Sequence, residues 1–290
     1  MAFEDVMGQT MQWITATEAL AALGAELASL QPGADVPESI TTALQGVSAA
    51  AGITGLADLA PQQQQMVLGV IRMYLHQAND LLERPGRAPG WTFTDPVILE
   101  GWGRGSAMVP PLIAAAHGDL AEVDSFLDVG TGVGWLAVAA ANQWPHATVV
   151  GIDPWTASLE RARANVSSAG LDDRITLRDQ DLADLADVDA FDCAWIPSFF
   201  LSEVALTDGL AATHSALRPG GWAVVGRMRP APNPLAAAVT ELRTIRGGGA
   251  NLDTDAVVAL LDKAGFTDLQ VAPSAGPSPM ELVLGQRPAG

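Results

Sequence analysis

The chain has 290 residues, of which 49% are hydrophobic and 17% charged, so we expect one large globular domain, or one domain with an appendage, and no extended disorder. Its formal net charge of −18 disfavours a nucleic-acid substrate, because such a chain repels phosphate backbones. The single cysteine excludes an internal disulfide and a Cys-rich zinc site, and we predict no metal. We also expect no membrane span, since no run of about 18 apolar residues occurs. The acidic residues 1–5 are unlike a secretory signal, so we expect a cytoplasmic protein.

Residues 1–118 are expected to form a helical N-terminal region. Apolar residues recur at helical spacing over 5–30, a second helix is expected over 37–51, and Pro61 opens a third. The third helix carries Tyr74 on its apolar stripe and His76 on its polar face. Tyr74 therefore either packs in a core or lines a substrate pocket, while His76 is expected to be solvated. These helices are also a possible homodimer interface.

Residues 84–90 have the composition of a linker, and residues 91–106 mix aromatic residues and glycines with the lone Arg104. This mixture suits a loop that packs over a ligand, with Trp102 and Arg104 as candidate substrate contacts, although an interdomain crossover fits equally well. A short helix over 110–117 then leads into the next strand.

Residues 126–139 form a short apolar run, a turn dense in glycine and an Ala-rich helix. We expect a buried strand, a tight loop and a helix whose N-terminus suits an anionic ligand group. Glycine permits both the sharp turn and the close approach of a ligand to the backbone. Strands and helices alternate from here onward, which predicts an α/β fold with a parallel sheet over residues 119–290.

The glycines at 130, 132 and 134, preceded by Asp128, resemble motif I of the class I S-adenosylmethionine-dependent methyltransferases. A dinucleotide fingerprint would place the third glycine one residue later. The resemblance implies a Rossmann-like sheet of seven strands with helices on both faces, the last two strands forming a hairpin. It also implies that Asp128 lies near the amino-acid part of the cofactor, with Thr131 in the turn that passes beneath it.

Three later markers fit the same family. Asp153 ends the second strand, where an acid can accept both ribose hydroxyls. Asp181 matches the acid that bonds the adenine amino group, although a solvated acidic turn is the alternative. The turn over 217–221 resembles the one before strand five. S-adenosylmethionine is thus the expected cofactor, with S-adenosylhomocysteine as product, and the expected cofactor-binding residues are Asp128, Gly130, Thr131, Gly132, Gly134, Asp153, Pro154, Trp155, Gln180, Asp181, Leu182 and Trp195.

The methyl acceptor should lie beyond strand four. Family members that methylate nucleobase or glutamine nitrogens often carry [D/N]-P-P-[Y/F] there, whereas this chain has Trp195-Ile-Pro-Ser-Phe-Phe200, which counts against such acceptors. We expect O-methylation of a small hydrophobic molecule. A carboxylic acid such as a fatty acid needs no base, whereas a phenol or other hydroxyl needs one that no histidine is placed to supply. The catalytic residues stay unassigned, and the expected substrate-binding residues are Tyr74, Trp102, Arg104, Pro197, Phe199, Phe200 and Arg227.

A second function class stays open at this point. The missing catalytic signature also permits a cofactor-binding protein without catalysis that acts through a protein partner.

Overall fold

The computed structural model describes residues 2–273 and 280–290. The chain forms two compact units, which we describe separately. The first contains the residues up to Pro85 together with Asp95–Gly101, and the second contains Gly86–Thr94 and Trp102–Gly290.

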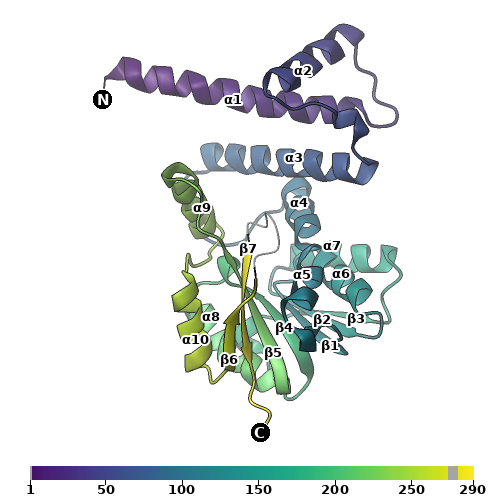
Figure 1. Ribbon diagram of the computed structural model, residues 1–290, viewed down its shortest axis with the longest axis vertical. Coiled ribbons are helices and arrows are strands. Elements are labelled where there is room, and N and C mark those ends of the chain that lie inside the picture. Colours follow the sequence, from purple (N-terminus) through teal and green to yellow (C-terminus); the bar gives the residue numbers. More distant parts are fainter. Residues whose placement is uncertain (1, 274–279) are drawn as a thin grey trace. The chain divides into compact units, whose positions relative to one another are not determined.

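The first unit is helical, as expected (Figure 1). Its core joins Leu27 of α1 to Leu56, Leu68 and Ile71, and the buried Glu26 accepts a hydrogen bond from Ser48 of α2. The elements are α1 (Phe3–Ser29), α2 (Glu38–Ala50), the 3-10 turn η1 (Leu56–Asp58), α3 (Pro61–Glu83) and the beginning of α4 (Pro96–Ser106).

The apolar stripe predicted for α3, which includes Val70 and Ile71, is only partly buried. Leu68, Ile71 and Met73 are buried, whereas Val70 is 41% exposed. Met73 packs on Gly101 of α4, where an added Cβ on Gly101 would lie 2.8 Å from the Cβ of Met73. The contact with α4 therefore defines the buried face of α3.

The second unit contains one seven-stranded sheet in the order β3-β2-β1-β4-β5-β7-β6, which confirms the predicted Rossmann-like fold. The first five strands are parallel, and β7 runs antiparallel to both β5 and β6. The strands are β1 (Ser125–Val129), β2 (Thr148–Asp153), β3 (Ile175–Asp179), β4 (Phe191–Pro197), β5 (Leu217–Met228), β6 (Thr267–Val271) and β7 (Met280–Gln286).

Helices cover both faces of this sheet (Figure 1). Side chains alternate along each strand, so that Cys193 and Trp195 face the helices α5, α6 and α7, while Ala194 and Ile196 face α8 and α10. The helices are α5 (Val109–Ala116), α6 (Trp135–Gln143), α7 (Thr156–Ser168), α8 (Glu203–Ala216), α9 (Pro234–Arg246) and α10 (Thr254–Lys263). None of the helices described has the length and apolar character needed to cross a membrane.

Two segments differ from expectation. The second part of the expected loop over 91–106 is the helix α4. Its Gly101 packs on Met73 and its Gly103 packs on Val133, and neither contact leaves room for a Cβ. The helix α9 was not predicted, although Asn233 caps it and Pro234 occupies its first turn.

Candidate active site

The glycine turn after β1 has the backbone that its sequence requires. Gly130, Gly132 and Gly134 have φ values of 67°, 56° and 83°, which L side chains rarely adopt. A Cβ on Gly134 would also lie 3.1 Å from that of Ala162, so α7 packs directly on the turn. The Nδ2 of Asn165 donates a 2.9 Å hydrogen bond to the carbonyl of Val133 and holds the turn in place.

Asp128 is fully buried at the end of β1. Thr131 Oγ1 donates a 2.7 Å hydrogen bond to its Oδ2, while Oδ1 has no hydrogen-bond partner among the residues described. Burial, assisted by the charge of Asp153, raises the pKa of Asp128 to about 7. A buried carboxylate oxygen without a donor suits the ammonium of an amino-acid group, so Asp128 fits its expected role beside the cofactor.

Asp153 ends β2 with its side chain fixed by the backbone. Its Oδ2 accepts a 2.8 Å hydrogen bond from Gly132 N–H, and its Oδ1 accepts one of 2.8 Å from Trp155 N–H. Burial raises the pKa of Asp153. Each oxygen keeps a second lone pair, so the carboxylate is oriented and still able to accept two hydroxyl groups.

The adenine candidates after β3 have local structural roles. Asp181 is exposed and caps the 3-10 turn η3 (Leu182–Asp184), since its Oδ1 accepts a 2.9 Å hydrogen bond from Ala183 N–H. Gln180 Nε2 donates to the carbonyl of Asp184 at 2.9 Å. The side chain of Leu182 is buried against Gly209 of α8. The structure therefore brings these residues to the correct edge but directs the Leu182 side chain into the core.

The two tryptophans among the expected cofactor-binding residues are in different environments. Trp155 is half-buried beside Asp153 and exposed Pro154, and its Nε1 donates a 3.1 Å hydrogen bond to the carbonyl of Phe93. Trp195 is 3% exposed in the core, and its ring covers Gly226, whose Cβ would lie 2.0 Å from Cη2 of the indole. Both residues thus lie near the carboxyl edge of the sheet, since Trp195 pairs in register with Asp128, but the side chain of Trp195 is buried in the core.

Five aromatic side chains meet beyond the end of β4. Trp91 lies 4.7 Å from Phe200, 5.9 Å from Trp102 and 5.1 Å from Phe93 between ring centroids, and Phe199 lies 4.7 Å from Phe200. We call these five residues the aromatic cluster. Trp102, Phe199 and Phe200 were predicted substrate contacts, whereas Trp91 and Phe93 were not.

The aromatic cluster lies close to the glycine turn. Phe199 and Phe200 belong to the 3-10 turn η4 (Ser198–Phe200), which directly follows Pro197. The Cγ of Pro197 lies 3.6 Å from the Cβ position of Gly130. Pro197 therefore lies beside the motif expected to hold the cofactor, two residues before Phe199.

A run of glycines after α9 packs behind the aromatic cluster. A Cβ on Gly249 would lie 2.0 Å from the carbonyl oxygen of Phe199, and one on Gly248 would lie 3.0 Å from Cα of Gly90. Ala250 N–H also donates a 2.9 Å hydrogen bond to the carbonyl of Leu201. Three successive glycines at 247–249 were the available sequence signal for this close packing.

Of the two arginines expected to bind the substrate, Arg104 lies beside the first residue of α6. Its guanidinium carbon is 4.5 Å from the ring centroid of Trp135, the first residue of α6. Gly103 beside it packs on Val133, so this end of α4 lies against the glycine turn.

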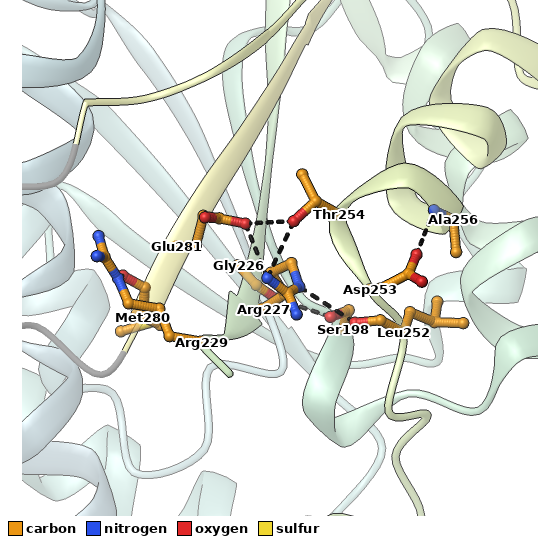
Figure 2. A network of polar contacts seen from close by, with 10 residues as sticks. All are labelled: Ser198, Gly226, Arg227, Arg229, Leu252, Asp253, Thr254, Ala256, Met280 and Glu281. Carbon is orange, nitrogen blue, oxygen red and sulfur yellow. Dashed lines mark hydrogen bonds and ion pairs between the residues drawn. The ribbon is translucent and has the colours of Figure 1, made fainter. Parts of the chain in front are cut away.

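Arg227 is buried in a polar network instead (Figure 2). Its Nη1 is 2.8 Å from Glu281 Oε2 and 3.1 Å from Thr254 Oγ1, and its Nε donates to the carbonyl of Leu252 at 3.1 Å. Thr254 Oγ1 donates to the same Glu281 oxygen at 2.7 Å. The positive charge of Arg227 is therefore compensated inside the protein.

The histidines are not placed as a base in this site. His117 precedes β1, His146 precedes β2 and His214 precedes β5, so these three lie at the amino edge of the sheet. His76 and Tyr74 belong to α3 in the first unit, where His76 Nδ1 lies 2.6 Å from Asp95 Oδ2. The ring of His76 is 45% exposed, as the sequence predicts for a solvated residue.

Comparison with known proteins agrees with this geometry. Residues 126–221 match a family model described as a methyltransferase domain. The methyltransferase GfsG of Streptomyces halstedii is 30% identical over 214 residues, which cover 68% of this chain and 73% of that protein. A ribosomal protein uL3 glutamine methyltransferase of Bradyrhizobium diazoefficiens is 47% identical over 60 residues, but these cover only 21% of this chain and 19% of that protein.

Solved structures extend the similarity to the whole fold. An O-methyltransferase family protein from Burkholderia thailandensis aligns with a TM-score of 0.71 at 17% identity, covering 100% of this chain and 99% of the other. Human N-acetylserotonin methyltransferase in complex with S-adenosylmethionine aligns with a TM-score of 0.69 at 15% identity, covering 98% of each chain. By the relationship to GfsG, together with the glycine turn and the two buried aspartates, this chain belongs to the class I S-adenosylmethionine-dependent methyltransferases.

Proposed function

We propose that the protein transfers the methyl group of S-adenosylmethionine to an oxygen of a small hydrophobic molecule. The observation that carries this proposal is the aromatic cluster, whose members Phe199 and Phe200 follow two and three residues after Pro197, the residue that lies beside the glycine turn. Aromatic side chains with a few polar groups are the usual lining of a small-molecule site.

The contribution of the protein is mainly to position the reactants. The cofactor supplies an electrophilic methyl group when it is bound. Asp128 and Asp153 would orient it through its ammonium and its ribose hydroxyls, and the aromatic cluster would hold the acceptor oxygen in line. Good alignment of this kind can contribute about 7–11 kcal/mol to lowering a barrier.

Within the O-methylation proposal, a carboxylic acid acceptor is favoured over a phenol. A carboxylate is ionised at neutral pH and needs no base, which matches a site whose own unit places its histidines at the opposite edge of the sheet. Arg104, above Trp135, would hold the acceptor charge. Arg227 is left out of this role because Glu281 already neutralises it.

Nitrogen acceptors are a weaker candidate. The uL3 glutamine methyltransferase matches only over 60 residues, and this chain has Ile-Pro-Ser-Phe after Trp195 where an amide or carboxylate would grip an N–H group. The aromatic cluster adds no carboxylate or side-chain amide to that position.

Two measurements test the proposal in sequence. Calorimetry with S-adenosylhomocysteine should show binding, and Asp153→Ala should weaken it about 100-fold or more, since two charge-assisted hydrogen bonds are lost. Asp172→Ala, an exposed aspartate before β3, is the matched control and should bind normally. If the unaltered protein does not bind S-adenosylhomocysteine, the proposed methyl transfer is wrong.

The acceptor is then identified with methyl-labelled cofactor against fatty acids of several lengths, aromatic acids and phenols. We expect labelled methyl esters, and a decrease of about tenfold or more in kcat/KM for acids in Arg104→Gln. Turnover of phenols alone would contradict the carboxylate assignment. Cofactor binding without turnover of any class would instead favour a non-catalytic protein that acts through a partner.

A further inference from the structure

The segment Gly86–Thr94, which we call the strap, belongs to the second unit, although the chain on both sides of it belongs to the first. It contains neither helix nor strand. Its conformation therefore depends on the side-chain and backbone contacts that hold it, and it contributes Trp91 and Phe93 to the aromatic cluster.

One end of the strap is held by Arg87. Its Nη1 donates to the carbonyl of Gly90 at 2.8 Å and to Thr92 Oγ1 at 3.0 Å, and its Nη2 donates to the carbonyl of Arg246 at 3.3 Å. Gly90 N–H reaches the same Arg246 carbonyl at 3.1 Å. The guanidinium carbon lies 4.4 Å from the ring centroid of Phe93. Arg87 thus shapes the strap and ties it to the end of α9.

The other end is held by Trp155. Its indole N–H donates to the carbonyl of Phe93 at 3.1 Å, while its backbone N–H donates to Asp153 Oδ1 at 2.8 Å. The residue that grips the strap is therefore itself fixed by the carboxylate that would hold the ribose. Between these two attachments, Trp91 lies against Phe200 at 4.7 Å and Trp102 at 5.9 Å.

We propose that Trp155 and Arg87 are positioning residues that set the strap in register with the cofactor site, and that Trp91 and Phe93 are acceptor-binding residues of the same methyl transfer. This inference rests on the proposed function. The indole N–H of Trp155 fixes the strap relative to Asp153, so the aromatic cluster is built at a set distance from the cofactor subsite. Positioning of this kind matters because small displacements of an acceptor reduce the rate strongly.

The test is Trp155→Phe, which keeps an aromatic ring and removes the donor. Hydrogen exchange of peptides covering 86–94 and 199–202 should become about 2- to 10-fold faster, as expected for the loss of one neutral hydrogen bond. In protein labelled with 5-fluorotryptophan, the Trp91 resonance should shift as its contact with Phe200 loosens.

Trp144→Phe is the matched control, because Trp144 Nε1 also donates to a backbone carbonyl, that of Leu120, at 3.1 Å. It should leave the strap exchange and the Trp91 resonance unchanged, and Arg87→Lys should loosen the strap as Trp155→Phe does. Unchanged strap exchange in Trp155→Phe would overturn the inference. Both readouts are measured without a ligand, so failure to bind S-adenosylhomocysteine would contradict the proposed function and the acceptor-binding role of Trp91 and Phe93, and the strap measurement would still decide the positioning roles of Trp155 and Arg87.

Discussion

Asp128 and Asp153 are buried at the carboxyl ends of neighbouring parallel strands, and their charges interact. Burying two carboxylates together costs stability unless donors or a cation compensate them. Asp153 has two backbone donors, whereas Asp128 has one oxygen without any among the residues described. This imbalance at the residue scale is expected of a site that binds a cationic ligand.

Asp128→Asn tests this imbalance through pH. The pKa of Asp128 is about 7 in the folded protein and about 4 when unfolded, so the folded state holds the proton more tightly. Its contribution to the free energy of unfolding is therefore greatest at low pH and falls as pH rises from about 4 to 7. The free energy of unfolding of Asp128→Asn, taken relative to that of the unaltered protein, should therefore rise by up to about 4 kcal/mol between pH 4 and pH 8.

Urea unfolding at pH 4, 6 and 8 measures this difference. If the unfolding free energies of the two proteins change in parallel with pH, Asp128 does not titrate in this range. The variant should also bind S-adenosylhomocysteine more weakly at pH 8, where a charged Asp128 would hold the ammonium.

Arg227 and Glu281 stabilise the fold and should not contribute to acceptor binding. Breaking a buried pair leaves an uncompensated charge, so Arg227→Met should cost about 3 kcal/mol of unfolding free energy. Adding Glu281→Gln should recover part of that loss, because no buried charge is then left alone. Urea unfolding of the single and double variants checks both statements, and an additive double variant would contradict the pairing.

At the scale of the element, close packing between segments shapes the acceptor side. The loop at 247–249 lies against η4 and the strap, and both contacts need glycine. These contacts keep Phe199 and Phe200 in fixed positions although η4 is a single short turn.

Gly249→Ala should therefore displace η4. Its Cβ would lie 2.0 Å from the Phe199 carbonyl oxygen, so we expect a loss of about 1–3 kcal/mol in unfolding free energy and slower acceptor turnover. Gly69→Ala in α3 is the control, since nothing lies within 4 Å of its Cβ and alanine favours helix. Equal stability of the two variants would show that the loop moves freely.

At the scale of the whole molecule, α1 exposes several large apolar side chains to solvent. Phe3, Met11 and Trp13 are 74%, 53% and 54% exposed, and burial within α1 is confined to residues 24–27. Exposed apolar patches of this kind mark interaction surfaces.

We therefore expect a homodimer that uses the exposed N-terminal part of α1. Sedimentation velocity at micromolar concentrations should show a dimer, and Trp13→Glu should shift it to monomer because a charge would be buried at the interface. Gln9→Glu, which adds the same charge at an already polar position, should leave the dimer intact. A monomer of the natural sequence would exclude this assembly.

The sequence alone determined the fold class and the cofactor edge, because both are recorded in local patterns. Glycine marks the positive φ angles at 130, 132 and 134, and apolar runs ending in Asp128 and Asp153 mark buried parallel strands. The positive φ angles and the buried strands each depend on a few consecutive residues, so the sequence predicts them without knowledge of distant contacts.

Only the tertiary structure decided which side chains meet. Arg227 finds Glu281, 54 positions away, and Gly249 packs on Phe199, so neither role is visible locally. Side chains alternate along β4, and this alternation directs Trp195 into the core. The strap places Trp91 against Phe200. The acceptor site that we propose depends on such long-range contacts, and for that physical reason local sequence patterns do not reveal all of its residues.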